Sequence, residues 1–196
     1  EVCPYEKLFE AVFREIQKEL KKKNGLTFSV ALVGSAKRNL VVRHHNKGFD
    51  CDYQLYLQRN KQELSAEKIK KLLIKKFDEK MPSEFDYCED STSSITIKKK
   101  ITKQSKIEFS YDIVIMDLYE DASYILRKNG SGQYVWNQLP DFTSFEDDYS
   151  QIEDADMWEN LRQCYYDKKI AKNNGSPKYK DKKLYKMYIL CQKRGL

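Results

Sequence analysis

Two short motifs, each attached to a strand-like segment, constrain this chain more than any other feature. Gly34-Ser35 ends the apolar run 26–33, and Asp50-Cys51-Asp52 opens an alternating run that extends to residue 57. Side chains alternate between the two faces of a strand, so the two aspartates share one face while the cysteine faces the other way. Carboxylates this close repel each other unless a cation lies between them. The pattern therefore predicts a metal-binding strand beside a tight turn.

A third acidic residue is expected to join this pair. The strand-like run 107–118 places aromatic and aliphatic side chains on one face and Glu108, Ser110 and Asp112 on the other. Asp112 is thus an acid in the middle of an otherwise apolar strand, and we expect it to be the third metal ligand. Asp117 is the alternative, although its place near the end of the run favours a strand-end or turn residue. Hard carboxylate ligands favour Mg²⁺, with Mn²⁺ as the alternative metal.

The turn at Gly34-Ser35 has the residue types of a phosphate-binding element. Glycine lets the backbone come close to a phosphate, and the serine hydroxyl and the following amides can donate hydrogen bonds to its oxygens. Lys37 and Arg38 follow directly and are expected to neutralise phosphate charge. These residues predict a nucleoside triphosphate as the ligand.

Apolar periodicity predicts the elements around these motifs. A helix is expected over residues 4–23, ending at Asn24-Gly25, and a second over 65–80, with Ser65 as its N-cap. The remaining expected strands are an antiparallel pair, 94–101 with 107–118, and a hairpin, 124–127 with 133–136. Because strands and helices are not regularly interleaved, the order predicts an α+β fold rather than a doubly wound parallel sheet.

The sequence changes character after Pro140, where an acidic stretch begins. We expect residues 1–140 to form the core and residues 141–196 to form a helical appendage packed on it, with helices near 155–170 and 181–194. In the hairpin, Tyr134 and Trp136 have two alternative roles, stacking on a nucleobase or packing into the core, and core packing is the more frequent fate.

The composition fits a globular domain in a reducing compartment. The 196 residues are 40% hydrophobic and 34% charged, with a net charge of +6, which suits polyanionic ligands but also an ordinary lysine-covered surface. No apolar run approaches the roughly 20 residues that span a bilayer, so no membrane association is expected. Five cysteines without CxxC spacing predict free thiols rather than zinc ligands, and hence a cytoplasmic protein.

The motifs together resemble a known signature. The segment Val33-Gly34-Ser35, followed by Asp50-Cys51-Asp52-Tyr53, resembles that of the polymerase-β-like nucleotidyltransferase superfamily. The run 109–114 resembles the strand that carries the third carboxylate of this superfamily, so the resemblance extends over residues 26–118. The leading helix also resembles that of the oligoadenylate synthase and bacterial cyclic-oligonucleotide synthase branch.

This resemblance implies a mixed, mostly antiparallel sheet of about five strands flanked by helices. It also implies transfer of a nucleoside monophosphate from a nucleoside triphosphate to a hydroxyl group, with release of pyrophosphate and two bound magnesium ions. Asp50 and Asp52 would bind both metals, and Asp112 would bind the metal on the acceptor side and help to deprotonate the hydroxyl. The acceptor stays open between a nucleotide, an RNA end, a small molecule and a protein. A nucleotide- or RNA-binding module without catalysis is the alternative function.

Overall fold

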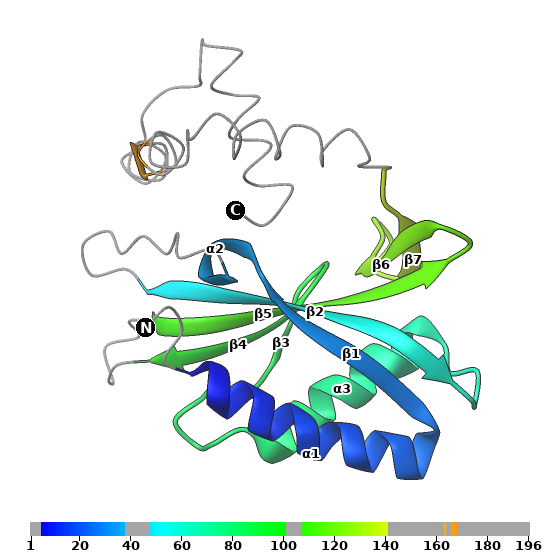
Figure 1. Cartoon of the computed structure of the whole chain (residues 1–196), viewed down its shortest axis with the longest axis horizontal. Helices are drawn as coiled ribbons and strands as arrows, with labels where there is room; N and C mark the ends of the chain where they lie inside the picture. The colour runs from blue at the N-terminus through cyan, green and yellow to red at the C-terminus, as the bar shows by residue number, and fades with distance from the viewer. Residues whose placement is uncertain (1–4, 38–47, 101–106, 141–162, 164–165, 168–196) are drawn as a thin grey trace, which may run out of the picture.

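The arrangement of the elements is given by a computed structural model that describes residues 5–37, 48–100, 107–140, 163 and 166–167. In chain order the elements are α1 (Glu6–Asn24), β1 (Leu26–Val33), α2 (Gly34–Lys37), β2 (Phe49–Asn60), α3 (Ala66–Lys80), β3 (Glu89–Asp90), β4 (Ile95–Lys100), β5 (Ile107–Tyr119), β6 (Ala122–Lys128) and β7 (Tyr134–Gln138). Helices α1 and α3 lie against one face of the sheet, and α2 lies on the other side (Figure 1).

The strands form one mixed sheet in the order β1-β2-β5-β4-β3, and the hairpin of β6 and β7 extends it from the far end of β5. Only the pairing of β2 with β5 is parallel among these strands, so the sheet is mostly antiparallel, as expected. The sheet has seven strands rather than about five, because the two-residue β3 and the hairpin both join it. The predicted α+β class and the antiparallel pair of β4 and β5 are confirmed.

The helices expected over residues 4–23 and 65–80 are present as α1 and α3, and local caps determine where α1 ends and where α3 begins. After α1, Gly25 takes a left-handed conformation (φ 61°) and its amide donates to the carbonyl of Leu20, which closes the last turn. At the start of α3, the Ser65 hydroxyl accepts a hydrogen bond from the amide of Lys68 at 3.4 Å. The expected cap and stop signals are therefore confirmed.

An aromatic cluster fixes the helical layer to the sheet. Phe9 of α1 stacks on Tyr53 of β2 with ring centroids 3.8 Å apart, and its ring lies 5.1 Å from that of Tyr111 of β5. Phe77 of α3 also stacks on the ring of Phe9, with ring centroids 5.8 Å apart. All four side chains are almost fully buried. The odd-numbered residues of β2 and β5 therefore face the helices, which leaves the even-numbered residues for the opposite face.

Several sequence predictions fall on residues that the structure does not describe. Arg38, expected to bind phosphate, is one of them. The appendage expected over residues 141–196 also lies outside the described residues, apart from residues 163, 166 and 167. Of the five cysteines, Cys51 and Cys88 lie in the described part, where Cys51 is buried and Cys88 is partly buried. No helix within the described ranges is long and apolar enough to cross a bilayer.

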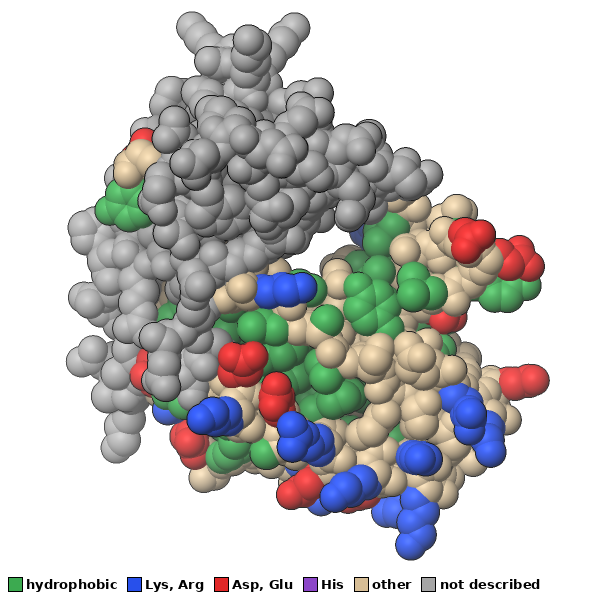
Figure 2. Space-filling view, viewed as in Figure 1, with side chains coloured by type: hydrophobic (Ala, Val, Ile, Leu, Met, Phe, Trp, Pro, Cys, Tyr) green, Lys and Arg blue, Asp and Glu red, His purple; other side chains and the backbone are tan. Residues whose placement is uncertain are grey.

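Ion pairs join the two helices along their solvent-facing sides. The carboxylate of Glu19 on α1 lies 3.0 Å from the ammonium groups of both Lys76 and Lys80 on α3. Acidic and basic side chains are intermixed over this layer (Figure 2). The contacts with Lys80 and then Lys76 lower the pKa of Glu19 from 4.5 to about 2.

The substitution Glu19→Gln should reduce the loss of stability in acid. Because the folded-state pKa of Glu19 is depressed, its contribution is fully present above pH 4.5 and is lost as the pH falls toward about 2. Urea unfolding of the wild-type chain between pH about 6 and about 3 should therefore show a larger drop in the free energy of unfolding than the variant does. Glu10→Gln, which breaks only the exposed 3.3 Å pair with Arg14 on the same helix, should keep the wild-type drop. Equal drops in all three proteins would contradict the prediction.

Candidate active site

The parallel pairing of β2 with β5 brings two of the predicted carboxylates side by side. In this register Asp52 lies opposite Asp112, and Asp50 lies opposite Ser110. Directly paired residues of neighbouring strands point to the same face. Since Tyr53 and Tyr111 face the helices, all three aspartates project from the opposite face of the sheet.

Gly34 lies beside this pair, at the start of α2. The preceding strand, β1, pairs with β2 so that Val33 lies opposite Asp52, which places the turn directly beside this carboxylate. A Cβ atom at Gly34 would lie 2.2 Å from Asp52 Oδ2, and the glycine has a φ of 70°. Both the close contact and the left-handed backbone exclude a larger residue here. The sequence therefore needs glycine at this position to bring β1 and the aspartate together.

The other residues of the turn differ in their exposure. Ser35 and Ala36 are buried within the one-turn helix α2, and Lys37, at its end, is exposed. Lys37 is thus accessible to solvent at the end of α2, which lies on the side of the sheet away from α1 and α3 (Figure 1). Its role in phosphate binding stays a prediction.

Asp50 and Asp112 each accept a hydrogen bond from a neighbouring strand. The Ser110 hydroxyl of β5 donates to Asp50 Oδ1, and the Thr96 hydroxyl of β4 donates to Asp112 Oδ1 at 2.5 Å. Asp52 Oδ2, in contrast, lies next to Gly34 at the start of α2. The three groups therefore share a face without converging, and no three acidic, histidine or cysteine side chains in the described ranges are grouped so as to hold a metal ion.

The electrostatic environment of Asp112 nevertheless suits a cation. Partial burial raises the pKa of this carboxyl, and the negative charge of Asp50 raises it further, whereas the hydrogen bond from Thr96 and the charge of Lys98 oppose the shift. A divalent cation beside these carboxylates would offset both the burial and the repulsion. The donor atoms are hard oxygens, so in chemistry and charge the three aspartates fit magnesium.

Asp117, the alternative third ligand, lies elsewhere. It is five residues beyond Asp112 on β5 and pairs with Tyr124 in the β5–β6 hairpin. At roughly 3.3 Å per residue, this places it about 16 Å along the strand from Asp112. Asp112 is therefore the acid that the sheet brings to Asp50 and Asp52.

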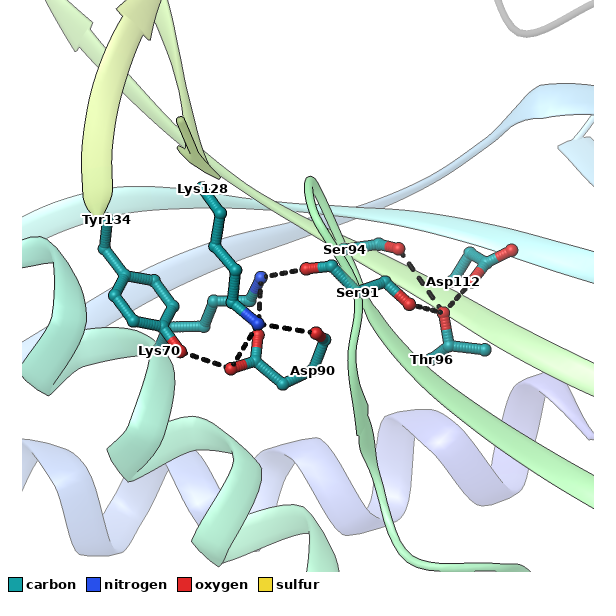
Figure 3. Close-up of polar contacts among 8 residues, drawn as sticks. All are labelled: Lys70, Asp90, Ser91, Ser94, Thr96, Asp112, Lys128 and Tyr134. Carbon is teal, nitrogen blue, oxygen red and sulfur yellow. Dashed lines mark hydrogen bonds and ion pairs between the residues drawn. The ribbon is translucent and has the colours of Figure 1, made fainter. Parts of the chain in front are cut away.

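A second polar cluster supports the strand next to Asp112 (Figure 3). The side chain of Lys70 on α3 is 1% exposed, and its ammonium lies 3.0 Å from Asp90 Oδ1 and donates to the carbonyl of Ser91 at 2.6 Å. Lys128 forms an ion pair with the same carboxylate at 3.0 Å, and the Tyr134 hydroxyl donates to it. Although partial burial acts in the opposite direction, these contacts hold the pKa of Asp90 below its usual range.

This cluster was not expected from the sequence. Lys70 is almost fully buried, whereas Leu72 on the same helix is only partly buried. The spacing of Lys70 from Leu73, three residues, was the signal that a lysine lay on the apolar side of the helix. The two aromatic residues of the hairpin, Tyr134 and Trp136, both pack against the core, and the Tyr134 hydroxyl also donates to Asp90.

A hollow in the described part lies away from the aspartates. It has a volume of about 560 Å³ and lies between the C-terminal half of α1 and the far ends of β1 and β2, where Thr27 pairs with Arg59. Arg59 is seven residues from Asp52 along β2, or about 23 Å in an extended strand. This hollow is therefore not part of the candidate site.

The substitution Asp90→Ala should destabilise the fold through Lys70. It removes the counter-charge of a buried ammonium, so we expect a loss of about 2 kcal/mol, below the value for a fully buried pair because Asp90 is 28% exposed. Asp86→Ala, which breaks the exposed 2.7 Å pair with Lys100, should cost less than about 0.5 kcal/mol. Urea unfolding measures both. A second substitution, Lys70→Met, should restore part of the loss, and no restoration would mean that the buried charge is not its cause.

Two bacterial proteins are among those whose solved structures are similar in fold to this chain. The cyclic AMP-GMP synthase DncV of Vibrio cholerae, in complex with the linear intermediate 5′ pppA(3′,5′)pG, aligns with 81% of this chain and 44% of its own, with a TM-score of 0.52 and 15% identity. The CD-NTase CdnG of Bradyrhizobium diazoefficiens, in complex with GTP, aligns with 72% of this chain and 39% of its own, with a TM-score of 0.50 and 16% identity. This chain thus spans less than half the length of either protein.

Neither a family model nor a curated protein matches the sequence. The likeness to the solved structures is therefore one of fold. The chain has the nucleotidyltransferase fold of DncV and CdnG, as the resemblance in its sequence implied.

Proposed function

We propose that this protein is a magnesium-dependent nucleotidyltransferase that uses a nucleoside triphosphate as donor. The observation that carries the proposal is the register of β2 and β5, which places Asp52 opposite Asp112 and beside Gly34. Three carboxylates on one sheet face next to a glycine turn suit a metal-bound triphosphate. The fold shared with a cyclic AMP-GMP synthase supports the same chemistry.

In the proposed reaction, the acceptor oxygen forms a bond to the α-phosphorus while the bond from that phosphorus to the β-phosphate oxygen breaks, which releases pyrophosphate. Asp50 and Asp52 would hold the metal ions that accompany the triphosphate, and Asp112 would act on the acceptor side, where it helps to remove the hydroxyl proton. When bound, the magnesium ions would supply charge stabilisation to the leaving group and activate the nucleophile. Gly34 would let the backbone approach the phosphates, with Ser35, Lys37 and Arg38 as further contacts.

A second nucleotide is the acceptor that we propose. The leading helix α1 runs for 19 residues under the sheet, as the resemblance to oligonucleotide synthases predicts. The DncV structure contains a linear intermediate in which two nucleotides are joined, and the CdnG structure contains GTP. Both favour a nucleotide acceptor over a small molecule or a protein side chain.

Substitution of the aspartates should separate catalysis from binding. The chain is incubated with Mg²⁺ and each nucleoside triphosphate, singly and in pairs, and pyrophosphate release and linked products are measured. Asp50→Asn, Asp52→Asn and Asp112→Asn should each lower the rate at least about a hundredfold, because each removes a metal ligand. Asp117→Asn, on the same strand as Asp112 but outside the site, should retain activity.

Two outcomes would contradict this proposal. Pyrophosphate release that persists in both Asp50→Asn and Asp52→Asn would mean that these residues are not the metal ligands. Tight nucleotide or RNA binding by the wild-type chain without pyrophosphate release would support the alternative of a binding module.

The substitution Gly34→Ala should impair the site locally. Its methyl group would meet Asp52 Oδ2 at 2.2 Å on a backbone with positive φ, so the turn must shift. We expect pyrophosphate release to fall at least about tenfold, since small displacements of metal-bound groups are costly in rate. Gly130→Ala is the matched control, because a Cβ there meets no atom within 4 Å and it should remain as active as the wild-type chain. Equal activity of the two variants would mean that Gly34 does not shape the site.

A further inference from the structure

Thr96 has no assigned role in the proposed reaction, yet it contacts Asp112 directly. It lies opposite Asp112 in the antiparallel pairing of β4 with β5, so both side chains project from the same face of the sheet. Its hydroxyl donates to Asp112 Oδ1 at 2.5 Å, a short hydrogen bond to a carboxylate (Figure 3). The Thr96 residue is only 8% exposed, which limits competition from water.

The Thr96 hydroxyl is itself held from the other side. The hydroxyl oxygens of Ser91 and Ser94, on the turn between β3 and β4, lie 3.3 Å and 3.4 Å from Thr96 Oγ1. Because the Thr96 proton goes to Asp112, its oxygen is the acceptor in these contacts. A chain of hydroxyls that all donate toward a carboxylate is mutually reinforcing. The Thr96 hydroxyl is thus held so that its proton points to Asp112.

The turn that carries the two serines is fixed to the rest of the fold. The buried Lys70 ammonium donates to the carbonyl of Ser91 at 2.6 Å, and Lys128 donates to the carbonyl of Asp90 at 2.8 Å. The backbone amide of Lys128 also donates to the carbonyl of Thr92 at 2.8 Å. Helix α3 and strand β6 therefore both hold the turn, which restrains the position of Ser91 and Ser94.

We propose that Thr96 is a positioning residue that orients the Asp112 carboxylate for the acceptor-side metal. The inference rests on the proposed function, since it assigns Asp112 a cation to bind. The hydrogen bond takes one lone pair of Oδ1 and restrains the orientation of the carboxylate, whose remaining lone pairs would be available to a metal ion. Without the hydroxyl, Asp112 would keep its place on β5 but lose its fixed orientation. Supporting residues of this kind commonly change metal affinity or rate about ten- to a hundredfold.

The test compares Thr96→Val, which removes the hydroxyl at equal shape, with Thr96→Ser, which keeps it. Binding of Mn²⁺ alone is measured by calorimetry, and steady-state pyrophosphate release is measured with Mg²⁺ and nucleoside triphosphates. Thr96→Val should weaken Mn²⁺ binding and lower kcat about tenfold or more, with the KM for the triphosphate nearly unchanged. Thr96→Ser should stay close to the wild-type chain. Thr27→Val, on β1 far from the aspartates, controls for the loss of a threonine hydroxyl from the sheet.

A double substitution separates positioning from a general loss of structure. In the Asp112→Asn background, Thr96→Val should have no further effect on Mn²⁺ binding, because the two residues act through one ligand. Additive losses would overturn the inference, as would Thr96→Val binding Mn²⁺ as tightly as the wild-type chain. A Thr96→Ser protein that is folded but as impaired as Thr96→Val would also overturn it.

The same data distinguish failure of this inference from failure of the proposed function. If pyrophosphate release depends on Asp50 and Asp52 but is unchanged in Thr96→Val, the function stands and the role of Thr96 is wrong. If no triphosphate is consumed, yet Mn²⁺ binding shows the expected coupling between Thr96 and Asp112, the role of Thr96 stands and the proposed reaction is wrong. Absence of any Mn²⁺ binding by the wild-type chain overturns the role of Thr96, whereas the proposed function is decided by pyrophosphate release alone.

Discussion

The packing of Phe9 against Tyr53 and Tyr111 determines which side chains the sheet offers to a ligand. Strands β2 and β5 both direct a tyrosine toward Phe9 of α1. Because side chains alternate along a strand, the residues next to these tyrosines face the opposite side of the sheet in both strands. A slip of one residue in either strand would bury an aspartate under α1 and expose a tyrosine, at a cost of several kcal/mol. The position of the acidic residues is thus set from the opposite face, by apolar contacts that take no part in chemistry.

The backbone and the side chains of the site obey different constraints. The strand register fixes the position of each aspartate on the sheet, and hydrogen-bond donors on neighbouring strands fix the direction of the Asp50 and Asp112 carboxylates. Groups of like charge lower their repulsion by turning toward separate donors, which is the arrangement that Asp50 and Asp112 adopt. A cation would give them a common partner. The sheet therefore fixes the positions of the acidic residues, and a bound ion would change the orientation of their carboxylates.

Local patterns in the sequence predicted the elements and the pairing of strands that follow each other in the chain, but not the order of the whole sheet. The apolar spacing and caps of α1 and α3, and the alternation of β2 and β5, follow from short-range rules, and the structure confirms them. That β5 inserts between β2 and β4, parallel to the former, depends on contacts across the chain that no local pattern specifies. Thr96 and Lys70 were missed for a related reason. A threonine in a strand and a lysine in a helix are ordinary residues until their partners on other elements are known.

The parallel pairing of β2 with β5 has a consequence for how the protein acquires its structure. Asp52 and Asp112 are about 60 positions apart in the chain, and the strands between them are joined through α3, β3 and β4. Contacts over such separations form slowly, because a long loop must close before any of them contributes. During synthesis, the segment that ends at α3 carries Gly34 and two aspartates but has no β5 beside it. The acidic centre is therefore completed late, only after residue 119 has left the ribosome.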